Sequence, residues 1–309
     1  MELVIGVDAG GTKTTALILN QDEDILFEAK SGIGNPAVDF PQALQNIKKV
    51  LIDCLQSRFG AECKAVAAGI AGIEAGNYKD LMYTELRKEF SIPILLMNDA
   101  ELAHFSLLKG SDGVVTIAGT GSVSFGRNGK KEGYTGGWGH LLGDEGSSYH
   151  IAMEACRQIA ICADKGIPFT DLSESIMRVL QLKEANDLKG FVYQSTKDQI
   201  AALSTHIYEM ALKGNEHANS LFQQAGIQLA QQTYFLLKKL DFQREKVLVS
   251  IKGSLLEKNE FVQGEFKKQL EMLYEGSKWA PSESSPAAGA IYAWQMAKGT
   301  DRWKRSSLD

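Results

Sequence analysis

A short apolar run that ends in an acid and a glycine-rich turn opens the chain. Residues 3–7 are apolar, Asp8 follows them, and the small residues 9–11 lead through Thr-Lys-Thr at 12–14 into a second apolar run at 16–19. This order predicts a strand, a turn with few side chains to keep a ligand from its backbone, and a second strand. The dinucleotide-binding and Walker patterns differ, because their glycine turns open a helix. The start of the chain is therefore expected to be a β-hairpin.

The same turn carries donors that suit a phosphate group. A concave row of backbone N–H groups at its glycines would form an anion-binding nest. The side chains of Thr12, Lys13 and Thr14 add two hydroxyls and an ammonium. Asp8 could hold Mg²⁺ through water, since this ion keeps most of its hydration and needs only one or two carboxylates. Taken alone, the stretch fits a plain hairpin with a glycine-rich tip equally well.

Length and composition exclude several classes of protein. The chain has 309 residues, enough for two domains that each have a core. A net charge of −5 argues against a general nucleic-acid or anionic-membrane binder. No stretch has the pattern of a signal peptide or the length of a membrane span. The four cysteines show no metal-binding spacing, so we expect reduced thiols in a cytoplasmic protein.

The first part of the chain alternates strands and helices. After the hairpin, apolar periodicity predicts a third strand at 24–30, helices at 39–59, 78–90 and from 100 to 108, and strands at 65–70 and 92–97. Such alternation implies a largely parallel sheet covered by helices. The glycine-rich loop 31–36 would bring Asn35 to a ligand, although it also fits a plain connection. Asp99 follows a strand and precedes a helix, where it could act chemically or as a helix cap.

The opening pattern recurs once. A strand at 114–118, the small-residue turn Gly119-Thr120-Gly121-Ser122, a strand at 123–127, the hairpin signal Asn128-Gly129 and a strand at 130–134 repeat it. This repeat predicts a duplicated architecture, with two phosphate-binding turns facing each other across a cleft. The first domain is expected at 1-110 and a larger one with helical insertions at 111-309. The final helix, 286-298, is a candidate to pack back on the first domain.

A second glycine-rich segment, 135–148, contains Trp138, His140, Asp144 and Glu145. A flat ring beside carboxylates suits a sugar, because the ring stacks on the C–H face while hydroxyls donate to the acids. The segment could also be a mobile surface loop whose acids cap the next helix. Beyond it we expect helices at 149–165, 171–182, 197–212, 216–240 and 259–273, a strand at 247–250 and a frayed tail at 301–309.

Together these motifs resemble the sugar-kinase, actin and heat-shock ATPase superfamily, over nearly the whole chain. Within it the chain resembles the N-acetylglucosamine kinase-like members of the BadF/BadG/BcrA/BcrD ATPase family. Residues 8–14 and 119–122 look like the two phosphate motifs, 98–100 like the segment with the catalytic acid, and 136–146 like the amino-sugar loop. One departure is Lys252-Gly253-Ser254, where the superfamily often carries Gly-Gly near adenosine.

The resemblance implies an α/β fold of two duplicated ribonuclease H-like (actin-like ATPase) domains around a central cleft. It implies a kinase that uses ATP and Mg²⁺ to phosphorylate the 6-hydroxyl of N-acetylglucosamine or N-acetylmuramic acid. Asp99 would be the catalytic base and Asp8 the residue for Mg²⁺. The nucleotide would lie on Gly10, Gly11, Thr12, Lys13, Thr14, Gly119, Thr120, Gly121, Ser122, Gly253 and Ser254. The sugar would lie on Asn35, Gly72, Asp99, Gly137, Trp138 and Asp144.

Three other functions stay open at this point. A glucosamine kinase differs from the kinase expected above only in the sugar that receives the phosphoryl group. An ATP-driven activator of a partner dehydratase or reductase would hold an iron–sulfur cluster, for which Cys156 and Cys162 are poorly spaced on one helix. A non-catalytic sugar sensor would need no base at Asp99. By resemblance a homodimer is plausible, whereas no nucleic-acid or membrane partner is expected.

Overall fold

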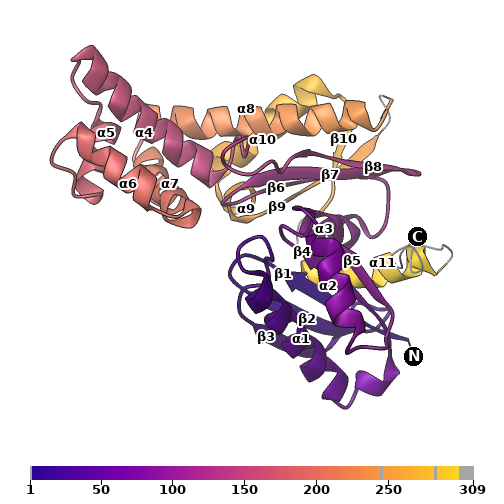
Figure 1. Cartoon of the computed structure of the whole chain (residues 1–309). Coiled ribbons are helices and arrows are strands. Elements are labelled where there is room, and N and C mark those ends of the chain that lie inside the picture. The colour runs from indigo at the N-terminus through magenta and orange to yellow at the C-terminus, as the bar shows by residue number, and fades with distance from the viewer. Residues whose placement is uncertain (1, 244–245, 282–283, 299–309) are drawn as a thin grey trace. The chain divides into compact units, whose positions relative to one another are not determined.

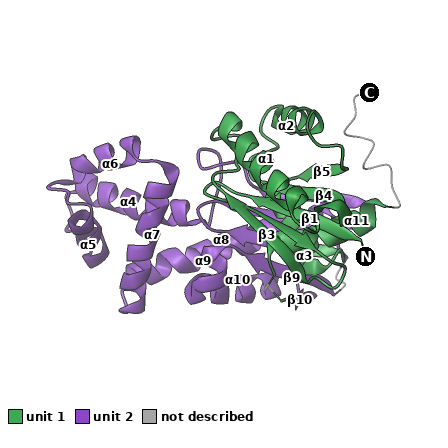
Figure 2. Cartoon of the chain, turned by 90° about the horizontal axis from the view of Figure 1, so that it is seen from below, with its two compact units in different colours: residues 1–115, 280–309 green, residues 116–279 purple. Residues whose placement is uncertain are grey.

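The computed structural model describes residues 2–243, 246–281 and 284–298, so the predicted tail at 301–309 lies outside the described residues. The chain divides into two compact units, one of residues 1–115 with 280–309 and one of residues 116–279 (Figures 1 and 2). The division follows Val115 rather than residue 110, and it returns the last segment to the first unit. Among the described residues, no helix combines the length and apolarity needed to cross a membrane.

The first unit is built on a five-stranded mixed sheet in the order β3-β2-β1-β4-β5. Its strands are β1 (Leu3–Ala9), β2 (Thr14–Leu19), β3 (Ile25–Ser31), β4 (Cys63–Ile70) and β5 (Ile94–Met97). The neighbours β1, β2 and β3 are antiparallel, which confirms the predicted hairpin, whereas β1, β4 and β5 are parallel. Because β1 is buried on both faces, its sequence reads as one apolar run instead of alternating with polar residues.

Helices cover both faces of this sheet. Leu3, Ile5 and Val7 of β1 share a core with buried residues of α1 (Phe40–Gln56) and α2 (Tyr78–Arg87). The intervening Val4 belongs to another core, with α3 (Asp99–Leu108) and α11 (Gly289–Ala297). Alternate residues of a strand point to opposite faces, so the two cores lie on opposite sides of the sheet. A short 3-10 helix, η1 (Gly60–Glu62), precedes β4.

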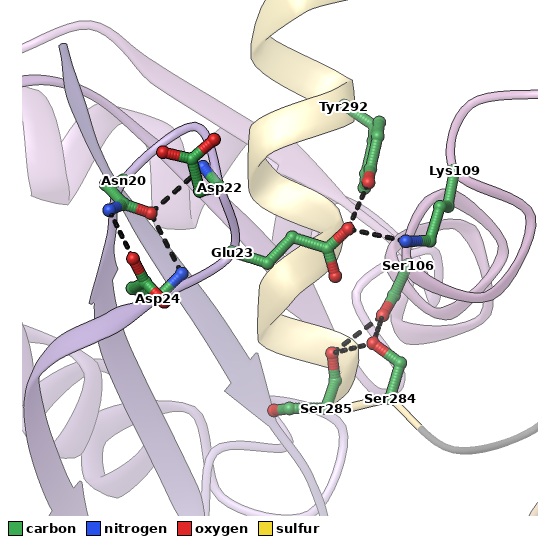
Figure 3. A network of polar contacts seen from close by, with 9 residues as sticks. All are labelled: Asn20, Asp22, Glu23, Asp24, Ser106, Lys109, Ser284, Ser285 and Tyr292. Atoms are coloured by element: carbon green, nitrogen blue, oxygen red, sulfur yellow. Dashed lines mark hydrogen bonds and ion pairs between the residues drawn. The ribbon is translucent and has the colours of Figure 1, made fainter.

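The C-terminal segment packs closely on the sheet of the first unit. At Gly6 in β1 an added Cβ would lie 1.9 Å from the carbonyl oxygen of Ala287, in the 3-10 helix η3 (Pro286–Ala288) that precedes α11. Polar contacts hold the same segment (Figure 3): Glu23 accepts from Lys109 at 2.8 Å and from the Tyr292 hydroxyl of α11. The final helix expected at 286-298 is therefore present and packs within the first unit.

The second unit repeats the sheet of the first. Its strands are β6 (Gly113–Ala118), β7 (Ser122–Asn128), β8 (Lys131–Gly136), β9 (Val247–Lys252) and β10 (Ser277–Trp279), in the order β10-β9-β6-β7-β8. Reading β6 to β10 as β1 to β5 gives the same order as in the first sheet. In both sheets the second and third strands are antiparallel and the last two are parallel. The predicted duplication is confirmed.

Most of the helices lie in the second unit. They are α4 (Ser148–Lys165), α5 (Asp171–Val179), α6 (Leu188–Gln194), α7 (Lys197–Leu212), α8 (Glu216–Lys239), α9 (Ser254–Lys258) and α10 (Glu260–Leu273), with a short 3-10 turn, η2 (Ala185–Asp187). The long helix α8 packs on α10, β7 and β8 (Figure 1). Three elements, α6, α9 and β10, are absent from the sequence-based prediction, because each is shorter than two full periods of the pattern that would mark it.

The close approach at Gly6 predicts a loss of stability in Gly6→Ala. The new methyl group would meet the Ala287 carbonyl, so β1 or η3 must move, at a cost of roughly 1–3 kcal/mol in the free energy of unfolding. Urea unfolding followed by tryptophan fluorescence measures this cost. Gly11→Ala is the control, because nothing lies within 4 Å of the Cβ it would add. Equal stability of the two variants would contradict the packing described for the C-terminal segment.

Candidate active site

Two carboxylates lie at one edge of the first sheet. In the parallel pairing Asp8 of β1 is opposite Gly69 of β4, and Gly69 is opposite Met97 of β5. Asp99 follows Met97 by two residues and begins α3. Because parallel strands end at the same edge, Asp8 and Asp99 come together there although they are far apart in the sequence. This is the edge at which open α/β sheets bind ligands.

The helix cap at this edge belongs to Asn98, not to Asp99. The Asn98 side chain accepts from the Ala100 N–H at 2.9 Å, and Glu101 completes a capping box with the Asn98 N–H. Asp99 also accepts from Ala100, at 3.0 Å. The alternative that Asp99 is simply the N-cap of the following helix is therefore wrong. A Cβ at Gly69 would lie 3.2 Å from the Asp99 Cα, so this glycine allows the start of α3 to approach β4.

Burial raises the pKa of Asp99 to about 6, and the negative charge of Asp8 adds to the effect. Both causes disfavour the ionised carboxylate. Asp99 is thus ionised at neutral pH but remains basic enough to accept a proton, which suits a general base. Among the described residues, no group of three or more His, Cys, Asp or Glu side chains could hold a metal directly. Asp8 fits a hydrated Mg²⁺, which needs only one or two carboxylates.

The structure places Asn35 and Gly72 against each other. Gly72 has φ +73°, and a Cβ there would lie 2.4 Å from the Asn35 side-chain oxygen. That oxygen accepts from the Ala37 N–H at 2.9 Å. The neighbouring Gly34 donates its N–H to the Gly10 carbonyl at 2.8 Å. The loop with Asn35 is therefore tied to the first turn.

The first turn differs in two ways from its prediction. Gly10 donates its N–H to the Lys13 carbonyl at 2.9 Å, and no residue from 8 to 14 has a positive φ, so an alternating left- and right-handed nest is not formed. Thr14 is fully buried and its hydroxyl donates to the Gly32 carbonyl at 2.9 Å. A hydroxyl has one proton to donate, and in Thr14 the Gly32 carbonyl takes it, which gives this side chain a structural role. The donors left exposed are those of Gly11, Thr12 and Lys13.

In the second unit the turn between β6 and β7 meets the start of α4. The carbonyl of Gly119 accepts from the Ser148 N–H at 2.9 Å, and that of Thr120 accepts from Tyr149 at 3.4 Å. Ser122 is buried, and its hydroxyl donates to the Glu145 carbonyl while its N–H donates to Asp144. Both donors of Ser122 are thus used within the protein.

Gly253 and Ser254 lie beside this second turn. At Gly253, with φ +93°, a Cβ would lie 2.4 Å from the Ala118 carbonyl oxygen at the end of β6. The Ser254 hydroxyl lies 3.6 Å from the position of a Cβ on Gly119. Two segments predicted to bind the nucleotide, far apart in sequence, therefore come together within one unit. Glu257 accepts from the Gly253 N–H at 3.0 Å, which fixes this junction.

The glycine-rich loop presents its aromatic ring and buries its acid. Gly136, Gly137 and Gly139 all have φ between +70° and +80°, a conformation that glycine adopts more easily than other residues. The side chain of Trp138 between them is exposed, at 72% of the residue's surface. Asp144 is only 3% exposed, and its carboxylate accepts from the Ser122 N–H at 3.1 Å. It also pairs with Lys197 of α7 at 2.7 Å. Lys197 was missed from the sequence, because it lies far along the chain and no motif surrounds it.

The structural role of Thr14 predicts the behaviour of Thr14→Val. This change keeps the shape of the side chain but removes the donor to Gly32, so the free energy of unfolding falls by about 1 kcal/mol. Thr14→Ser retains the donor and most of the stability. Thr12→Val, at an exposed position of the same turn, leaves stability unchanged. Thermal unfolding of the three variants measures the differences, and a Thr14→Val protein as stable as the wild type would contradict the assignment.

Comparisons with known proteins identify the family. Residues 5–293 match the model of the BadF/BadG/BcrA/BcrD ATPase family. The N-acetylmuramic acid/N-acetylglucosamine kinase of Clostridium acetobutylicum is 31% identical over 303 residues, which are 94% of this chain and 97% of the relative. The N-acetyl-D-glucosamine kinase of Dictyostelium discoideum is 30% identical over 308 residues, 94% of this chain and 96% of the relative.

The fold is also similar to that of a solved structure. A candidate N-acetylglucosamine kinase from Chromobacterium violaceum superposes with a TM-score of 0.73 at 20% identity, over 94% of this chain and 98% of that one. The α/β fold with two five-stranded mixed sheets is thus that of two-domain sugar kinases, as expected from the motifs. The family match covers almost the whole chain, and the protein belongs to the BadF/BadG/BcrA/BcrD ATPase family.

Proposed function

We propose that this protein transfers a phosphoryl group from ATP to the 6-hydroxyl of an N-acetylated amino sugar. The observation that carries the proposal is Asp99, a carboxylate with a pKa of about 6 at the carboxyl edge of a parallel sheet, beside Asp8. Both full-length relatives named above are kinases of N-acetylated amino sugars. Phosphoryl transfer needs positioning, charge neutralisation and a base for the acceptor hydroxyl, and the chain offers residues for each.

Asp99 is the base in this proposal. Its carboxylate accepts the proton of the sugar hydroxyl as the hydroxyl oxygen attacks the terminal phosphorus of ATP. Mg²⁺, held through water by Asp8, would neutralise charge on the transferring group when bound. Gly11, Thr12 and Lys13 are exposed in the first turn and would contact phosphate oxygens. Thr120 and Gly121 of the second turn, with Gly253 and Ser254 beside it, would take the rest of the nucleotide.

For the sugar we propose one group of residues in each unit. Asn35 and Gly72 adjoin each other in the first unit, together with Asp99. Gly137, Trp138 and Asp144 belong to the glycine-rich loop of the second unit, where the exposed indole of Trp138 offers a flat surface to a sugar ring. An N-acetylated acceptor is preferred to glucosamine, because the two relatives that align over nearly the whole chain are named for N-acetylated sugars.

The activator alternative finds little support in the cysteines. Cys156 and Cys162 of α4 are 2% and 8% exposed. A cluster shared between subunits needs thiolates at a surface, whereas burial raises the pKa of Cys156 to about 11 and disfavours its thiolate. The kinase therefore remains the proposal.

The proposed base predicts the kinetics of Asp99→Asn. Loss of the proton acceptor lowers kcat by about 10²–10⁴-fold, whereas the Kd of N-acetylglucosamine changes little, because the amide keeps the shape of the side chain. Coupled detection of ADP and calorimetric titration of the sugar measure the two quantities. The control is Asp39→Asn, at the N-cap of α1, where Asn caps as well as Asp. Near-normal turnover of Asp99→Asn would remove Asp99 from the base role.

A second prediction concerns the dependence of activity on pH. Because only the ionised Asp99 accepts a proton, kcat/KM for the sugar falls by about tenfold per unit as the pH drops below about 6. The charge of Glu101 is among the causes that raise the pKa of Asp99. Glu101→Gln removes this charge but keeps an acceptor for the capping box, so in this variant the fall in kcat/KM should move to lower pH. A fall that begins only near pH 4, or one that Glu101→Gln does not move, would contradict the assignment.

A further inference from the structure

Lys197 forms an ion pair whose carboxylate is unusually well buried. Its ammonium lies 2.7 Å from the Asp144 carboxylate, and the side chain of Asp144 is 4% exposed while that of Lys197 is 31% exposed. In every other ion pair of the described residues the carboxylate is at least 15% exposed. The ammonium therefore lies between a buried acid and solvent.

The same ammonium lies against the second turn. A Cβ added to Gly121 would be 2.9 Å from the Lys197 Nζ, and 2.9 and 3.0 Å from the two carboxylate oxygens of Asp144. Gly121 thus leaves room for the ion pair directly beside its backbone. Residues 119–121 are half-buried, so a ligand that reaches this turn also reaches the ammonium. Thr196 caps α7 and joins a capping box with Gln199, which fixes the helix that carries Lys197.

Stability alone is a weak reason for this pair. Taking a carboxylate out of water costs free energy that its ion pair rarely regains. An Asn at 144 could accept the Ser122 N–H, and could also bond to the proposed sugar, without bringing a charge that needs a cation. Moreover, an ammonium has three N–H donors, and the ion pair with Asp144 takes up at most one of them. The remaining donors are available to an anion at the turn.

We propose that Lys197 is a phosphate-binding residue, whose ammonium donates to phosphate oxygens of the nucleotide at the second turn while Asp144 holds it in place. The inference rests on the proposed function, because it requires that a nucleotide binds there. Lys197 would give the second turn a cation for phosphate, as Lys13 does for the first turn. A purely structural clamp on Asp144 is the competing explanation.

The experiment is a series of ligands with increasing numbers of phosphates. The Kd values of adenosine, AMP, ADP and ATP are measured by calorimetry in Mg²⁺ for the wild type, Lys197→Met and Lys197→Arg. In Lys197→Met the Kd of ATP should rise roughly tenfold or more while that of adenosine changes less than about twofold. Lys197→Arg keeps a cation and should retain most of the affinity. The control is Lys268→Met, which removes an exposed lysine paired with the partly buried Glu265.

A second variant distinguishes a loss of phosphate binding from a folding defect. Lys197→Met leaves the Asp144 carboxylate buried without its cation, so the double change Lys197→Met with Asp144→Asn is measured as well. It removes both charges and keeps an acceptor for Ser122. The same selective loss of phosphate-bearing ligands in both variants supports the proposal. Equal weakening of all four ligands, or no weakening, overturns it in favour of the structural clamp.

The failure of the proposed function would look different. If the wild type binds ATP and phosphorylates amino sugars but Lys197→Met binds ATP normally, only the role of Lys197 is wrong. If the wild type binds ATP, loses that binding in Lys197→Met and phosphorylates no sugar, the phosphate contact stands and the kinase proposal fails. If the wild type binds none of the four ligands, both are wrong.

Discussion

The parallel pairing of β1, β4 and β5 is the constraint on which the candidate site depends. It sets Asp8 opposite Gly69 and Gly69 opposite Met97, so that the acids at the ends of β1 and β5 meet at one edge. Burial, together with the nearby charge of Asp8, raises the pKa of Asp99 into the range in which a carboxylate can take a proton near neutral pH. The absence of a side chain at Gly69 lets α3 start close to the sheet. A shift of register by one residue would turn Asp8 to the other face.

The second unit has the same strand order as the first, but different contacts hold its turn. Its turn after β6 is held by the start of α4 and by Asp144, and Gly253 brings the end of β9 against Ala118. The helices α4 to α7 have no counterpart in the first unit, and one of them supplies Lys197. Duplication thus provided two similar sheets, and insertion added side chains that a bare sheet cannot offer.

Local patterns in the sequence predicted much of this arrangement. The hairpin at residues 8–14, its repeat at 119–122 and the long helices follow from apolar periodicity and glycine position, and all are present. The side-chain partners were harder to foresee. Thr14 and Ser122 look like phosphate donors, yet both hydroxyls donate to carbonyls of neighbouring loops, at Gly32 and Glu145. Lys197 carries no local signal at all, since only the packing of α7 brings it to Asp144. Contacts of this kind depend on tertiary structure, which periodicity does not describe.

The most direct test of the account is ADP release from MgATP by the wild-type protein with a panel of sugars. The panel contains N-acetylglucosamine, N-acetylmuramic acid, glucosamine, N-acetylmannosamine and glucose. The account predicts turnover that depends on the sugar and is fastest with N-acetylglucosamine or N-acetylmuramic acid. ATP hydrolysis that is independent of every sugar, or no ADP release at all, would contradict the kinase assignment.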